Sequence, residues 1–165
     1  MENSTRQQQH GKAMASMKYT TFALMIAAGT IIMFGLMYLN TYALDHIFYS
    51  ETRAYMAVIM GATMALVMLL FMWKMYPNKV ANISILIGSV IALFVALWLV
   101  RSQTTIDDVA YMRAMIPHHS IAILTSERAN ITDPRVRKLA DDIIAAQRRE
   151  IGEMKSYIQD LEAKR

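Results

Sequence analysis

Long apolar runs without a single charge alternate with short polar stretches over the first hundred residues. The runs extend from 19 to 43, from 54 to 73 and from 80 to 100. Each is long enough to cross the roughly 30 Å hydrocarbon core of a bilayer as one α-helix. Aromatic residues gather near their ends, as they do where membrane helices meet water. The pattern predicts three transmembrane helices in a region 19–100, after a polar tail (1–18) that is expected to be disordered.

After residue 100, charged residues return and apolar residues recur at helical spacing. The start signal Thr105–Asp108 predicts a helix from about 107 to 115, and Pro117 predicts either a kink or a second helix that ends near 129. Asp133 before Pro134 predicts the N-cap of a longer helix, about 134–162. Its apolar stripe comprises Val136, Leu139, Ala140, Ile143, Ile144, Ile151, Met154, Ile158 and Leu161.

The expected fold class is therefore all-α, with three transmembrane helices followed by a small helical hairpin at 101–165. Two helices in about 60 residues form a thin core. Pairing of two chains into a four-helix bundle would cover the rest of the apolar stripe. A homodimer is accordingly an expected arrangement of the hairpin.

Composition and charge sharpen this division of the chain. Of the 165 residues 55% are hydrophobic and 18% are charged, which is more apolar than an average soluble domain. Residues 101–165 hold 11 of the 17 Lys and Arg and 10 of the 13 Asp and Glu. No Lys/Arg stripe is interleaved with aromatics, so nucleic acid is not an expected partner. The chain has no cysteine, so a soft-metal site would have to use Met and His.

Positive charges beside the apolar runs predict an orientation in the membrane. The N-terminal tail and the second loop are richer in Lys and Arg than the first loop. By the positive-inside rule the N-terminus is cytoplasmic and residues 101–165 are extracytoplasmic. Arg101, directly after the third run, is a small argument against this. The charges are Arg6, Lys12 and Lys18 in the tail, Arg53 in the first loop, and Lys74 and Lys79 in the second.

Four soft or borderline metal ligands lie within eight residues: Met112, Met115, His118 and His119. In a helix Met112, Met115 and His119 share a face, whereas His118 points about 100° away. Met154 on the longer helix can lie opposite that face. Thioethers and imidazoles favour Cu(I), with Ag(I) its chemical analogue, over Mg²⁺ or Ca²⁺. The alternative is ordinary core packing, which methionines at helical spacing serve more often.

A second methionine pattern lies within the second apolar run, where Met56, Met60, Met64, Met68 and Met72 recur every four residues. It could form a thioether track for Cu(I), but adaptable packing against the other helices is the favoured interpretation. His46, in the first loop, could be an accessory ligand, and more often such a residue is solvated.

Residues 107–161 carry the pattern Met112-x-x-Met115-Ile116-Pro117-His118-His119, then Ala122-Ile123, and later the stretches 139–147 and 150–154. In these motifs the chain resembles the family labelled domain of unknown function 305 (DUF305), which is grouped with ferritin-like bundles. Its members look like copper- or silver-binding proteins of the bacterial envelope. The resemblance implies Met112, Met115, His118, His119 and Met154 as ligands, with Gln147 and Glu150 in support. Leu124 stands where the family often has another methionine.

The sequence as a whole predicts a membrane-anchored protein that binds Cu(I) or Ag(I) for sequestration, tolerance or delivery. Its expected location is the bacterial inner membrane, and its expected partners are the bilayer, a second copy and a metal exporter or another envelope metal-handling protein. Two alternatives remain: an interaction protein whose helical tail docks a partner, and a small transporter subunit. No nucleophile–base pair, nucleotide loop or Glu-x-x-His is visible, so no enzyme is expected.

Overall fold

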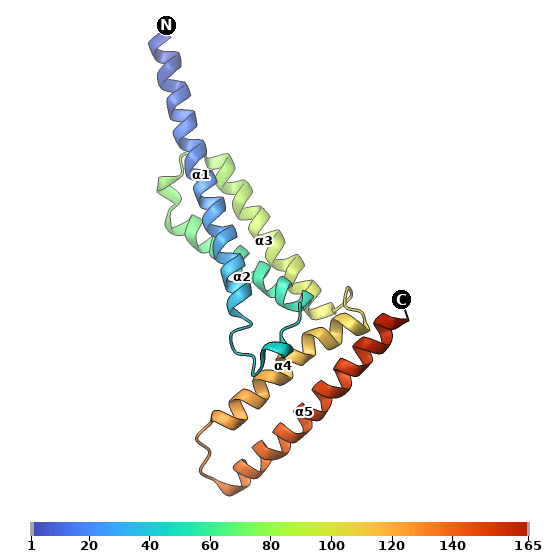
Figure 1. Ribbon diagram of the computed structural model, residues 1–165. Helices are drawn as coiled ribbons and strands as arrows, with labels where there is room; N and C mark the ends of the chain where they lie inside the picture. The colour runs from blue at the N-terminus through green and yellow to red at the C-terminus, as the bar shows by residue number, and fades with distance from the viewer. Residues whose placement is uncertain (1, 165) are drawn as a thin grey trace. The chain divides into compact units, whose positions relative to one another are not determined.

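The computed structural model of the chain describes residues 2–164, with side chains from Lys18 onward (Figure 1). Residues 2–164 contain helices and no strand, which confirms the all-α prediction. The chain divides into two compact units: the apolar unit (Met1–Phe34 and Tyr55–Ser102) and the hairpin unit (Gly35–Ala54 and Gln103–Arg165). The elements are α1 (Glu2–Leu36), η1 (Leu44–His46), α2 (Glu51–Phe71), η2 (Trp73–Met75), α3 (Lys79–Ser102), α4 (Asp108–Arg128) and α5 (Pro134–Ala163).

Three helices are long and apolar enough to cross a membrane, as the hydropathy pattern predicts: Lys18–Leu36, Glu51–Phe71 and Lys79–Ser102. Near the start of the apolar part of α1, Phe22 packs with Ala65, Leu69 and Tyr76 in a buried cluster. Beside it the fully buried Asn82 accepts a hydrogen bond from the Tyr19 hydroxyl (2.7 Å) and donates one to the Tyr76 carbonyl (3.1 Å). A buried amide is stable there because its polar groups are satisfied.

The first apolar helix ends at Leu36, seven residues before the end that the sequence predicts. The residues that follow pack on protein instead of continuing the helix. The Tyr38 hydroxyl accepts a hydrogen bond from the Ser50 N–H (3.2 Å), and Arg53 donates to the Met37 carbonyl (2.6 Å). Its guanidinium also lies over the Tyr38 ring, 4.4 Å from the centroid. Hydropathy alone does not separate an apolar residue facing lipid from one facing protein.

The polar tail also differs from its expectation, because α1 extends back to Glu2 through residues expected to be disordered. Extending a formed helix adds one hydrogen bond per residue and avoids the cost of a new nucleus. The tail contains no proline to stop this extension. Disorder was expected because the tail is polar, but polarity decides whether a segment is buried more than whether it forms a helix.

Helices α1 and α2 approach closely at Gly61. A Cβ atom at this position would overlap the Thr30 side chain on α1. One turn away, a Cβ at Gly29 would lie 2.8 Å from the Met64 Cε atom. Met68 and Met72 pack against the buried cluster described above. These contacts favour packing as the role of the methionine row in α2.

We expect Gly61→Ala to lower the stability of the apolar unit by about 1–3 kcal/mol, the usual cost of overpacking. Gly88→Ala on α3 is the matched control, because a Cβ there meets nothing within 4 Å. Both substitutions raise the helix propensity by the same amount, so the difference between the stabilities of the two variants measures the α1–α2 contact. The check is unfolding of each variant in detergent by increasing dodecyl sulfate. Equal stabilities would show that α1 and α2 do not pack through Gly61.

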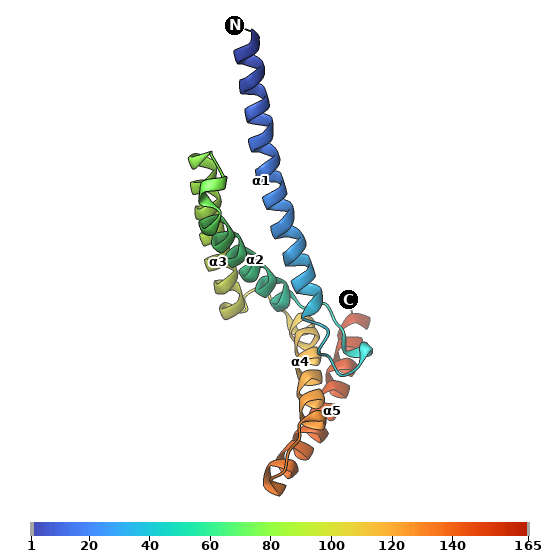
Figure 2. The ribbon, with the colours of Figure 1, turned by 90° about the vertical axis from the view of Figure 1, so that its left-hand side faces the viewer.

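The hairpin unit contains the antiparallel pair α4 and α5, which lie side by side in both views (Figures 1 and 2). Asp133 caps α5 by accepting the Arg135 N–H (2.8 Å), and Pro134 occupies the first turn, as predicted. The cap of α4 is Asp107, which accepts the Ala110 N–H (2.7 Å), and Thr105 lies two residues too early. Each cap satisfies a backbone donor that the helix itself leaves unpaired.

Of the two alternatives predicted at Pro117, a kink or a second helix, the second helix is wrong, because Asp108–Arg128 is a single helix with the proline inside it. Proline removes one helical hydrogen bond, to the carbonyl of Arg113. The Pro117 ring is fully buried, so its packing offsets the lost bond. Met115 and the two histidines therefore belong to one continuous helix.

The core of the hairpin unit has Ile116 and Ile123 from α4 against Ile151 and Ile158 from α5. Val109 and Met112 complete this buried cluster. On the predicted stripe of α5, Val136 (49%) and Leu139 (59%) stay largely exposed. The stripe is thus only partly covered within a single chain.

Candidate metal centre

The four candidate ligands of α4 divide between a buried and an exposed face. Met112 is 7% exposed and belongs to the core, Met115 and His119 are half-buried, and His118 is exposed. The centroids of the two histidine rings are 6.4 Å apart at an angle of 69°. The helix thus separates His118 from the other three, as its 100° offset predicts.

His119 is held at both ring nitrogens. Nδ1 lies 3.0 Å from the carbonyl oxygen of Met115, one turn earlier on α4. A carbonyl only accepts, so Nδ1 is the donor in that bond. Nε2 is directed at α5, where it lies 2.9 Å from Oε2 of Glu150. An imidazole anchored through Nδ1 on a backbone carbonyl is how proteins orient many metal-binding histidines.

Glu150 therefore has a larger part in the site than the supporting position that the sequence indicates. Its carboxylate touches the candidate ligand His119 directly and is the nearest negative charge to Nε2. Gln147, one turn earlier on α5, is half-buried, and its side chain makes no hydrogen bond to another described residue. The two supporting residues thus differ: Glu150 contacts the site and Gln147 lies beside it.

Met112 and Met154 line a single pocket of about 550 Å³ between α4 and α5. Met154 also packs against the core cluster to which Met112 belongs. The pocket is completed by Asp108, Tyr111, Tyr157, Asp160, Leu161 and Lys164. Met112 and Met154, one from each helix, therefore line the same pocket.

Two pairs of side chains, each joining α4 to α5, mark the ends of the stretch in which Met115, Met154 and His119 lie. Arg113 pairs with Glu162 at one end, and His119 contacts Glu150 at the other. Met115 falls between the two α4 positions, and Met154 between the two α5 positions. The register of the hairpin thus places Met115, Met154 and His119 in the same short interval of the α4–α5 interface.

The described residues contain no group of three or more His, Asp or Glu side chains that could hold a metal ion. A site for hard or borderline cations made from such ligands is therefore not found in that part of the chain. The predicted site differs in kind, because thioethers make up most of its ligand set.

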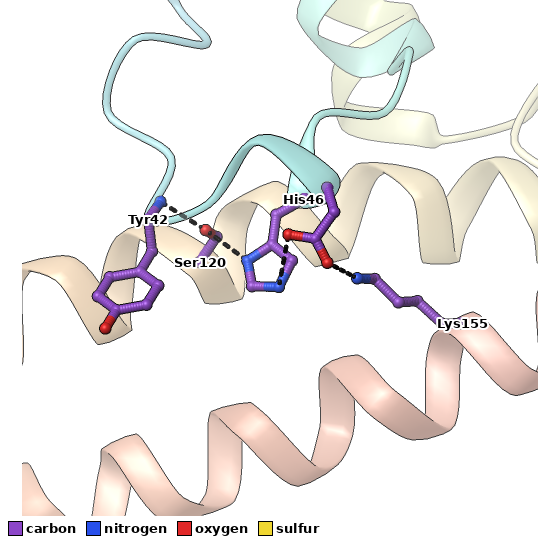
Figure 3. A network of polar contacts seen from close by, with 5 residues as sticks. Tyr42, His46, Ser120 and Lys155 are labelled. Carbon is purple, nitrogen blue, oxygen red and sulfur yellow. Dashed lines mark hydrogen bonds and ion pairs between the residues drawn. The ribbon is translucent and has the colours of Figure 1, made fainter.

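His46, expected to be a solvated loop residue, is instead 13% exposed and lies against α4. Its Nδ1 atom is 2.9 Å from the hydroxyl of Ser120, whose side chain is fully buried (Figure 3). We call the segment Gly35–Ala54, which belongs to the hairpin unit, the strap. Sequence reasoning missed Ser120 and the strap. The one available signal was a serine directly after the histidine pair on a helix face that also carries core residues.

Ser120, His46 and Asp45 form a Ser–His–Asp series, because His46 Nε2 lies 3.9 Å from Asp45 Oδ1. Nucleophilic catalysis would need the serine hydroxyl to reach a substrate carbonyl. Ser120 is 0% exposed and its oxygen already accepts the backbone N–H of Tyr42 (2.7 Å). This geometry is suited to holding the strap and not to attack on a substrate.

The strap joins α1 to α2, whereas α4 and α5 follow α3. Contacts such as Lys155 Nζ to Asp45 Oδ2 (2.6 Å) join the strap directly to the hairpin. The first loop and the hairpin must therefore lie on the same side of any membrane that α1, α2 and α3 cross. An odd number of spans before the hairpin gives the same result.

Comparison with known proteins gives a match to a family model and a match to a curated protein. Residues 108–165 match the model of a domain of unknown function, DUF305. The uncharacterized protein L153 of Acanthamoeba polyphaga mimivirus is 43% identical over 77 residues, which is 46% of this chain and 51% of that protein. The chain thus spans about half the length of this relative. No solved structure matches the chain.

Proposed function

We propose that the chain is a membrane-anchored protein that binds Cu(I), or its analogue Ag(I), in the α4–α5 hairpin. The observation that supports this proposal is that Met112 and Met154 line one pocket, and that Met115, Met154 and His119 lie in one short interval of the α4–α5 interface. Two thioethers and an imidazole form a ligand set that selects soft ions, and Cu(I) accepts such low coordination numbers. The match to DUF305 covers this part of the chain.

Each residue has a distinct proposed part. Met112, Met115 and Met154 supply sulfur, and His119 supplies Nε2, which its Nδ1 bond to the Met115 carbonyl keeps directed at α5. Glu150 Oε2, 2.9 Å from that nitrogen, lies where an ion bound to Nε2 would sit, so this carboxylate turns aside to admit the cation and then offsets its charge. His118, exposed beside the site, serves as an outer ligand during capture or release of the ion.

The apolar helices supply the anchor in this proposal. We infer a bacterial inner membrane, with the N-terminus cytoplasmic and the hairpin outside, from the Lys and Arg of the flanking segments. The proposed activity is sequestration or handover of the ion, with no chemical conversion, to an exporter or other envelope protein. The exposed Val136 and Leu139 support a second copy of the chain as a further partner.

A second candidate function is docking of a partner protein by the hairpin, with the methionines as packing. The burial of Met112 in the core cluster favours this alternative. In that case replacing the methionines with leucine, which conserves volume, would leave the function unchanged.

The test is titration of the full chain in lipid nanodiscs with Cu(I) under reducing conditions, against a chromophoric chelator. The full chain is needed because residues 101–165 alone would lack the strap. We expect the wild type to compete with the chelator, and Met112→Leu with Met154→Leu to bind at least about 100-fold more weakly. Met60→Leu with Met64→Leu in α2 is the matched control and should bind as the wild type does. A wild type that cannot compete would refute metal binding and favour the docking function.

A further inference from the structure

The strap is held to α4 by one serine hydroxyl that serves two partners (Figure 3). The Tyr42 backbone N–H can only donate, so the Ser120 oxygen accepts that bond, which is 2.7 Å long. The hydroxyl hydrogen is then available to Nδ1 of His46, 2.9 Å away. In this arrangement Nδ1 accepts, and the ring proton sits on Nε2, which faces Asp45. The contacts therefore match a neutral His46 ring.

The charges around His46 give a proton on this ring little support. Asp45, on the strap itself, lies 3.9 Å from Nε2 but is 70% exposed and hydrogen-bonded to Lys155 of α5. The facing residue of α4 is the neutral Ser120. Burial lowers the pKa of His46; the Asp45 carboxylate opposes this shift, and the positive charge of Lys155 adds to it.

We propose that the strap is an acid-released clamp, in which a neutral His46 ring holds Gly35–Ala54 on α4 and α5 and a single proton on that ring frees it. Several contacts remain when the ring is charged, among them the Tyr42–Ser120 bond, the Lys155–Asp45 pair and the packing of Phe48. The second is largely exposed on the Asp45 side and therefore weak. His46 is the contact that a single proton weakens.

The direction of the pH effect follows from proton linkage. In a released strap His46 has its ordinary pKa of 6.5, and in the closed strap its pKa is lower. The released state binds the proton more readily, so closure is fully favoured above about pH 6.5 and weakens as the pH falls. Between the two pKa values, the population of the released state rises about tenfold per pH unit.

Release would also change the core of the hairpin unit. Phe48 belongs to the strap and packs against the buried cluster that includes Met112 and Ile116. A freed strap carries this ring away and opens that side of the core to water. The clamp operates in this way whether or not the hairpin holds a metal ion.

Hydrogen exchange of the full chain in nanodiscs, from about pH 7.5 to about pH 5, tests the clamp. The readout is the exchange rate of strap amides around Tyr42, divided by the intrinsic rate at each pH. We expect this ratio to rise in the wild type as the pH falls below 6.5, by up to about tenfold per unit, and to be flat in His46→Gln. His118→Gln, which changes an exposed histidine outside the clamp, should behave as the wild type. A flat wild-type ratio, or an unchanged slope in His46→Gln, would overturn the proposal.

A second variant keeps the test decisive if His46→Gln releases the strap at every pH. Lys155→Gln removes the positive charge that faces His46 and leaves Asp45 free to stabilise a proton on the ring. The onset near pH 6.5, which the pKa of His46 in the released strap sets, should therefore stay in place, whereas the total rise in exchange relative to pH 7.5 should be smaller than in the wild type. A rise equal to or larger than that of the wild type would show that His46 does not control release.

Discussion

Replacing His119 with glutamine is expected to weaken Cu(I) binding by more than the roughly 10- to 100-fold that loss of an outer partner of a metal site costs. His119 is the imidazole that the structure orients, through Nδ1 on the Met115 carbonyl and Nε2 toward α5. Glutamine keeps polarity and length but offers no imidazole nitrogen. The measurement is the same chelator competition with the full chain in nanodiscs.

His118→Gln is the control for this prediction, because it makes an identical change one residue away on the exposed face. We expect its affinity to stay within about twofold of the wild type, and its rate of metal transfer to the chelator to fall. Circular dichroism of both variants checks that α4 and α5 remain helical. If His118→Gln lost more affinity than His119→Gln, the ligand assignment would have to be reversed.

Ile116→Ala is expected to cost the hairpin unit about 2–5 kcal/mol, the usual range for removing a large aliphatic side chain from a core. Ile116 is 0% exposed and lies at the centre of the cluster shared by α4 and α5. The total free energy of unfolding of a small domain is roughly 5–15 kcal/mol, so the loss is a large fraction of its stability. The free energy of opening, from hydrogen exchange of α4 and α5 amides, measures it.

Leu139→Ala on α5 is the comparison for this second prediction. Leu139 belongs to the apolar stripe predicted from the sequence but is 59% exposed. In a single chain its truncation should change the opening free energy by no more than about 0.5 kcal/mol. A cost near that of Ile116→Ala, present only at high protein concentration, would show that a second copy covers this face.

Hydrophobic periodicity carries most of the information about this fold. Uncharged runs mark the three apolar helices, and Asp133 with Pro134 marks the start of α5, because length and capping are local properties. The second helix that was one of the two alternatives at Pro117 does not begin there, since burial of the ring compensates for the lost bond. Packing of this kind depends on residues far away in the chain.

Part of the candidate site could likewise be predicted from the sequence, and part could not. Spacing along α4 correctly separates His118 from His119, because helix geometry fixes the offset. The contact of Glu150 with His119 depends on the register between two helices, which a single sequence leaves open. His46 and Ser120 are 74 residues apart and share no local pattern, so their pairing could not be foreseen.

The strap also bears on the order in which the chain is built. Its contacts join residues 78 positions apart at Tyr42 and Ser120, and 110 apart at Asp45 and Lys155. A ribosome adding about 5–20 residues per second completes Lys155 roughly 5–20 s after Asp45. During that interval Phe48 and His46 have no surface to bind. The α4–α5 pair is local and forms first, so the hairpin unit becomes complete only when a segment synthesised much earlier docks onto it.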